Sequence, residues 1–163
     1  MERTTEVYLD IETNWERELT VVGFRSSATG LVQLVGSEIT SRRLRKELPR
    51  GGRLFTYNGH CFDLSCIHGQ LGLDLRSQFE SFDLRWICQR IGLMGGQKRI
   101  ERRIGHKRKY AEMDGLDAIR LWNEHERGDQ EALALLLRYN AEDLTGLARI
   151  KRHLSARGLL SNQ

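Results

Sequence analysis

The segment EVYLDIE, residues 6–12, decides how this chain folds. Its apolar side chains alternate with polar ones, and a period of two is typical of a β-strand. Asp10 and Glu12 stand two residues apart, so both carboxylates point to the face opposite the apolar side chains. We therefore predict a first strand that buries one face and carries a pair of acids on the other.

The rest of the chain changes from strand patterns to helix patterns as it moves away from this segment. β-Branched and apolar runs predict further strands at 19–24, 31–35, 53–57 and 79–83. Helical spacing predicts helices at 41–48, 61–71, 84–91, 97–104, 115–125 and 129–153. Three antiparallel strands followed by strands alternating with helices indicate the α/β class, with a five-stranded mixed sheet flanked by helices.

Length and composition indicate an ordinary globular chain. Its 163 residues suit one domain, which we expect over residues 1–157, with a frayed tail at 158–163. Hydrophobic residues make up 39% and charged residues 29%, and no run approaches the ~20 apolar residues of a membrane span. The N-terminus, MERTTEVYLD, lacks the apolar core of a signal peptide. We expect a cytoplasmic protein with no membrane partner.

The three cysteines, Cys61, Cys66 and Cys88, are an odd number in a chain without an export signal. A disulfide framework is not expected in such a chain, so we expect reduced thiols. A zinc site of Cys61, Cys66 and His68 is a weaker hypothesis, because there is no CxxC pair and no evident fourth ligand.

Basic residues are concentrated in two segments of a chain whose net charge is +4. Six lie between Arg42 and Arg53, and seven lie between Lys98 and Lys109, where only Glu101 opposes them. Such clusters attract polyanions, although a solvated surface loop is the alternative for either one. We expect nucleic acid as the partner, held by its phosphates at five residues of the second segment: Lys98, Arg99, Arg102, Arg103 and Lys107.

Two acidic elements can carry chemistry, and each has a structural alternative. Asp10 and Glu12 can hold divalent cations between them, or they can lie on a solvated face. Asp63 follows the strand and the Asn58-Gly59 turn in the segment YNGHCFD, and enters the first turn of a helix. It can serve the same cations, or it can simply favour the helix dipole.

The last predicted helix supplies a third acidic element. Tyr139 and Asp143 are four residues apart and share a face, which neighbouring apolar residues turn toward the sheet. A carboxylate that points inward needs a partner, because an unpaired buried charge is very costly. That partner is either a metal ion or a buried arginine or lysine.

Together these elements resemble the DEDD exonuclease superfamily in its tyrosine-bearing branch. The matching patterns are D-x-E in the first strand, N-x-x-x-F-D after the fourth, and Y-x-x-x-D in the last helix. A closer similarity is to the YprB-like ribonuclease-H-like domains, and it covers nearly the whole chain. It rests on YLDIET (8–13), TYNGHCFDL (56–64), FDLRW (82–86), GGQKRIERRIG (95–105) and LLRYNAEDLTGL (136–147).

The resemblance implies an RNase H-like fold and a 3′→5′ exonuclease that acts on single-stranded or frayed ends of DNA or RNA. It also implies two Mg²⁺ or Mn²⁺ ions held by Asp10, Glu12 and Asp143, with Asp63 contributing directly or through water. Tyr139 would orient the attacking water. An unperturbed tyrosine pKa near ~10 makes this residue a poor base at neutral pH.

Other residues divide between nucleic-acid contacts and structural roles. We expect Thr13 and Asn58 near the nucleic acid, and Trp15 either stacked on a base or anchoring its loop. Asp83 and Asp114 precede helices, where capping is the expected role. We expect the remaining two tryptophans, Trp86 and Trp122, to pack in the core.

Two other functions are compatible with the same fold. One is an endonuclease of the ribonuclease H or resolvase type, which the Tyr-x-x-x-Asp helix argues against. The other is a non-catalytic nucleic-acid-binding module, which the presence of all four acids and Tyr139 argues against.

Overall fold

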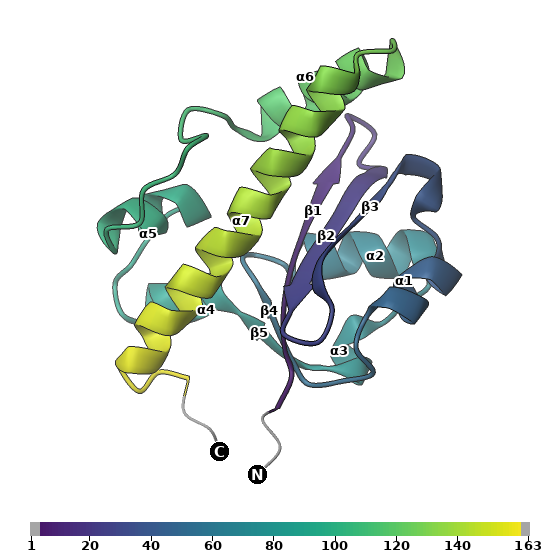
Figure 1. Cartoon of the computed structure of the whole chain (residues 1–163). Coiled ribbons are helices and arrows are strands. Elements are labelled where there is room, and N and C mark those ends of the chain that lie inside the picture. Colours follow the sequence, from purple (N-terminus) through teal and green to yellow (C-terminus); the bar gives the residue numbers. More distant parts are fainter. Residues whose placement is uncertain (1–3, 161–163) are drawn as a thin grey trace.

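The computed structural model describes residues 4–160, which form a mixed sheet with helices packed against it (Figure 1). The strands are β1 (Glu6–Thr13), β2 (Leu19–Ser26), β3 (Gly30–Val35), β4 (Arg53–Thr56) and β5 (Glu80–Asp83). The helices are η1 (Gly36–Glu38), α1 (Ser41–Glu47), α2 (Asp63–Leu71), α3 (Leu75–Gln78), α4 (Leu84–Arg90), α5 (Gln97–Arg103), α6 (Gly115–Glu126) and α7 (Gln130–Ala156).

Strand β1 lies at the centre of a five-stranded sheet with the order β3-β2-β1-β4-β5. It pairs antiparallel with β2, which pairs antiparallel with β3, whereas β4 and β5 run parallel to it. Its parallel pairing with β4 ends at Tyr8 and Phe55, before the two acids of β1 are reached. The predicted α/β class, strand number and mixed sheet are confirmed.

The two faces of the sheet are covered by different parts of the chain. Val7, Leu9 and Ile11 pack with residues of α1, α2 and α3 in one core cluster. On the other face, α4, α5 and α7 pack over Phe55, and α6 and α7 pack over Val21. In Figure 1, α7 crosses the sheet on the face opposite α1–α3. The acids of β1 therefore lie on the same side of the sheet as α7.

Some local predictions differ from the structure. Helix α3 was not expected, and Asp74 caps it by accepting a hydrogen bond from the amide of Arg76. Trp122 is buried as predicted, but the prediction that Trp86 packs in the core is wrong, because 48% of its surface is exposed. Helical spacing shows which residues share a face, but it does not show whether another element covers that face.

Among the described residues of the expected tail, Gly158 and Leu159 are exposed, whereas Leu160 is buried and packs in the same cluster as residues of α7. Residues 161–163 lie outside the described part. Asp83 and Asp114 cap α4 and α6 as predicted. Within residues 4–160, no helix has both the length and the apolar character that a bilayer span requires.

Helix α7 packs closely against the sheet where β2 has a glycine, Gly23. A Cβ atom placed on Gly23 would lie 1.9 Å from Oδ1 of Asn140, a distance that no side chain tolerates. Asn140 is fully buried, and its neighbour Tyr139 is nearly so. Gly23 therefore lets α7 lie close enough to the sheet to bring its polar side chains to β1.

We predict that Gly23→Ala destabilises the protein by about 1–3 kcal/mol, because α7 or the sheet must shift to accept the methyl group. Gly69→Ala is the matched control, since a Cβ at this exposed position in α2 meets nothing within 4 Å. It should be neutral or stabilising by up to about 1 kcal/mol. Urea denaturation of both variants measures the difference, and equal stabilities would contradict the close approach.

Candidate metal centre

Three carboxylates from two distant parts of the chain meet on the α7 side of the sheet. Asp10 and Glu12 come from β1, and Asp143 comes from α7. One oxygen of each lies within 4.8 Å of the others, which makes them a group able to hold a metal ion. The spacing of two residues in the strand and the inward face of the helix, both predicted from sequence, bring these acids together.

Asp63 lies beside this group, without being one of its three members. It is the first residue of α2, and its Oδ1 accepts a hydrogen bond of 3.1 Å from the amide of Ile11 in β1. This amide lies beyond the end of the parallel pairing with β4, so Asp63 takes the place of a strand partner. Asp63 therefore joins α2 to the strand that carries the other acids.

Burial and mutual repulsion make the four acids reluctant to ionise. Burial first, and then the charge of Asp143, raise the pKa of Asp10 and of Glu12 well above the usual range. Burial raises the pKa of Asp63 to about 7 and that of Asp143 to about 6. Such shifts are typical of groups that are held together for a functional reason.

The amide of Asn140 fixes the orientation of Asp10. Its Nδ2 donates to Oδ2 of Asp10 at 2.9 Å and to the backbone carbonyl of Asp10 at 3.3 Å. Gln33 of β3 donates in turn to Oδ1 of Asn140 at 3.0 Å, which fixes which side of the amide faces the acid. Sequence reasoning missed Asn140 and Gln33, because their roles depend on the contact between α7 and the sheet.

Arg108 neutralises part of the negative charge of the site through ion pairs that include Asp143. This buried guanidinium lies 2.6 Å from Oδ1 of Asp143, 3.1 Å from Glu101 and 3.4 Å from Glu142. Glu101 is fully buried and lies against Gly146 of α7, where a Cβ atom would be 1.8 Å from its Oε1. The alternative predicted for Asp143, a buried arginine as its partner, is therefore present.

Arg108 leaves the charges of Asp10 and Glu12 uncompensated. It is shared among three acids, and it leaves Asp10 and Glu12 without a paired cation within residues 4–160. Oε1 of Glu12 is buried and has no hydrogen-bond partner in this part of the chain. A buried charged oxygen with no partner is costly, and hard carboxylate oxygens are the ligands that Mg²⁺ and Mn²⁺ prefer. The residues present therefore fit a divalent cation.

A cleft of about 590 Å³ opens over the acids and is lined on one side by basic residues. Asp10, Tyr139 and Asp143 line it together with three of the predicted nucleic-acid contacts, Lys98, Arg99 and Arg102 of α5. The Nζ of Lys98 lies 4.9 Å from the centre of the Tyr139 ring, and it has no hydrogen-bond partner among the described residues. Three basic side chains and two of the clustered acids thus face the same space.

Not all predicted contacts line this cleft. Arg103 and Lys107 are exposed but are not among its lining residues, and neither is Trp15, which is 64% exposed. Thr13 ends β1 beside Glu12. Asn58 has a positive φ of 62°, and its Oδ1 accepts a hydrogen bond from Arg85, so its side chain holds the turn in place.

Arg108 and Glu101 were missed as site residues, although the sequence held one signal. Glu101 is the single acid in a basic segment, and a lone opposite charge in such a run can indicate a specific ion pair. The spacing could not show that Arg108 is the partner of Glu101, nor that the same arginine pairs with Asp143. Both depend on how the loop after α5 folds back onto α7.

Comparison with known proteins gives a family and a fold. The sequence profile of RNase_H_2, described as the RNase_H superfamily, matches residues 7–155. The chain is similar to the family B DNA polymerase of the hyperthermophilic archaeon Pyrobaculum calidifontis, with a TM-score of 0.72 and 17% identity. This similarity covers 94% of the chain but 25% of the polymerase, and at this identity it shows the fold alone. No curated protein matches the chain.

We predict that Asp63→Asn stabilises the metal-free protein at high pH. The folded-state pKa of Asp63, about 7, lies above its ordinary value of 3.8, so the wild type loses stability as pH rises through this interval. In EDTA at pH 8, the variant should be more stable by about 2 kcal/mol, a rise in Tm of roughly 4–8 °C.

At pH 5 the difference should be less than half of that at pH 8, because pH 5 lies only part of the way through the interval from 3.8 to about 7 over which the stability is lost. Thermal denaturation at both pH values measures it, and Glu112→Gln, at an exposed position, is the control. If the variant is no more stable than the wild type at pH 8, or gains as much stability at pH 5 as at pH 8, the ionised Asp63 does not destabilise the folded protein.

Proposed function

Because this chain belongs to the RNase H superfamily, we propose that it is a metal-dependent nuclease that removes nucleotides from the 3′ end of single-stranded DNA or RNA. The observation that carries the proposal is the meeting of Asp10, Glu12 and Asp143 beside a buried, unpartnered oxygen of Glu12. A cluster of this kind is unfavourable for stability, so it requires a function that uses its charge.

In this proposal Asp10, Glu12 and Asp143 hold one or two Mg²⁺ or Mn²⁺ ions. Asp63 lies close enough for its charge to act on Asp10, and it adds negative charge to the site. Such ions activate a water molecule and neutralise the phosphate that is cleaved. Asn140 keeps Asp10 turned toward the cleft, and Arg108 keeps Asp143 in place from the opposite side.

Tyr139 positions groups in the cleft and does not act as a base. Burial, and then the charge of Asp143, raise its pKa above its ordinary value, so its hydroxyl keeps its proton at neutral pH. A protonated hydroxyl can donate a hydrogen bond to a phosphate oxygen or orient a water molecule. Lys98 lies over the same ring and can contact the phosphate as an ammonium.

Arg99 and Arg102 hold the backbone of the strand on the wall of the cleft. Contacts to phosphates position a strand without reading its bases, so we expect little sequence preference. The ion pair between Arg108 and Asp143 favours a second candidate, a binding module without catalysis, because one acid is already neutralised. Cleavage assays separate the two.

We predict that the protein with Mn²⁺ shortens a 5′-labelled single strand in steps of one nucleotide, and that Asp10→Asn or Glu12→Gln lowers the rate at least 100-fold. Each substitution removes one charged ligand of the cation and changes few contacts. Gel electrophoresis of the products measures this, with Glu112→Gln as the exposed control. Discrete internal cuts would indicate an endonuclease, and binding without cleavage the non-catalytic module.

We predict different effects for two neighbouring arginines. Arg102 lines the cleft and Arg103 does not, so Arg102→Glu should weaken binding of a single strand about tenfold at low salt, and Arg103→Glu far less. The slope of log affinity against log salt concentration should also become shallower for Arg102→Glu alone. Fluorescence anisotropy of a labelled strand in EDTA measures both, and equal slopes would place the phosphates elsewhere.

A further inference from the structure

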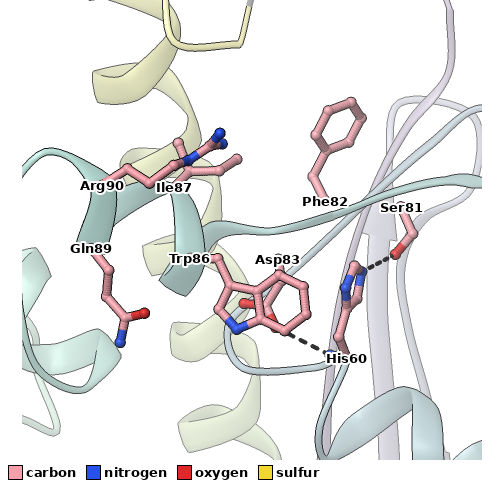
Figure 2. Close-up of a pocket in the computed structure, with 8 residues that line it drawn as sticks. All are labelled: His60, Ser81, Phe82, Asp83, Trp86, Ile87, Gln89 and Arg90. Carbon is pink, nitrogen blue, oxygen red and sulfur yellow. Dashed lines mark hydrogen bonds between the residues drawn. The ribbon is translucent and has the colours of Figure 1, made fainter.

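A second hollow lies outside the metal centre, beside β5 and the start of α4. It encloses about 650 Å³, and its lining includes His60, Ser81, Asp83, Trp86 and Arg90. Figure 2 shows the indole of Trp86 beside His60, with Asp83 behind it and Arg90 on the same helix. None of these residues was assigned to a nucleic-acid contact by its sequence pattern.

The indole of Trp86 is exposed and touches the ring of His60. Its side chain is 48% exposed, whereas Trp122, the other tryptophan in a helix, is buried. The ring of His60 meets it edge-on, with ring centres 5.0 Å apart and planes at 89°. His60 in turn is hydrogen-bonded through Nε2 to Oγ of Ser81 at 2.7 Å. The indole is therefore supported at one edge, and its exposed surface is available for stacking.

The charge of the hollow suits a nucleotide. Arg90 follows Trp86 by four residues, so the two share a face of α4, and Arg90 is exposed. Asp83 is the one acid among the lining residues, and its carboxylate already accepts hydrogen bonds from the amides of Asn58, His60 and Arg85. Backbone amides thus compensate its charge, and the exposed guanidinium of Arg90 can meet a phosphate.

One short loop separates the hollow from the metal centre. Tyr57, directly after β4, lines the cleft over the acids, and His60, three residues later, lines the hollow. The same loop leads into Asp63 at the start of α2. Residues of one loop therefore line both the cleft and the hollow.

We propose that this hollow binds an unpaired base of the nucleic-acid strand, stacked on Trp86, with Arg90 contacting a neighbouring phosphate. The inference rests on the proposed function in that it takes the same strand as the ligand. Its role is to hold the strand at a point away from the reacting phosphate, so that it contributes to affinity and not to the chemical step.

The test measures binding of a fluorescently labelled eight-nucleotide single strand by anisotropy in EDTA, where no cleavage occurs. Trp86→Ala should lower the affinity about tenfold, since one stacked base contributes roughly this factor, and Trp86→Phe should retain most of it. Leu31→Ala is the matched control, because Leu31 is an exposed apolar residue on β3, at the opposite edge of the sheet. It should bind as the wild type does.

A second strand, which carries abasic sugars in place of its nucleotides, tests the stacking itself. Trp86→Ala should leave the affinity for this strand unchanged, because no base is present to lose. Equal losses on both strands, or no loss on either, would overturn the proposal. A wild type that binds neither strand would overturn it as well. Because no metal is present, failure of the cleavage assay leaves this result intact.

Discussion

The mutual repulsion of four carboxylates in a poorly hydrated place is the constraint on which the rest of the structure depends. Burial raises the pKa of Asp10, Glu12, Asp63 and Asp143, and neighbouring carboxylates raise it further. Their surroundings offset the repulsion only in part, through hydrogen bonds from Asn140 and the amide of Ile11 and through the ion pair with Arg108. In the proposed function, the charge that remains favours cation binding, because a bound cation offsets the repulsion between the buried acids.

The architecture places this charge where two elements from opposite ends of the chain cross. Strand β1 is central in the sheet, so its position is fixed from both sides. Helix α7 is long enough to contact β1 and both of its neighbouring strands, β2 and β4. Two glycines make the contacts possible. Gly23 allows α7 to approach the sheet, and Gly146 leaves room on α7 for the buried carboxylate of Glu101. Small residues thus set the geometry of a site in which they take no chemical part.

Much of the fold followed from the sequence, because its signals are local. Alternation in β1 and helical spacing around Tyr139 and Asp143 indicated both the elements and the faces on which the acids lie. What could not be predicted depends on contacts between distant segments. Arg108 is one of several basic residues in the same segment, and no sequence feature distinguishes it from the others. Only the folded loop brings it to Asp143. For Trp86, the pattern gave the helix but not the fact that no other element covers its indole.

The three-way ion pair of Arg108 ties the connection between α5 and α6 to the helix that carries Asp143. Glu101 holds it from α5, whereas Glu142 and Asp143 hold it from α7. In the proposed function, a neutral residue at position 143 or at position 10 removes one cation ligand. At position 143 it would also break the ion pair with Arg108 and loosen a segment of the scaffold, whereas at position 10 it alters mainly the contact with Asn140. Substitution of Asp143 would therefore disturb more of the structure than substitution of Asp10.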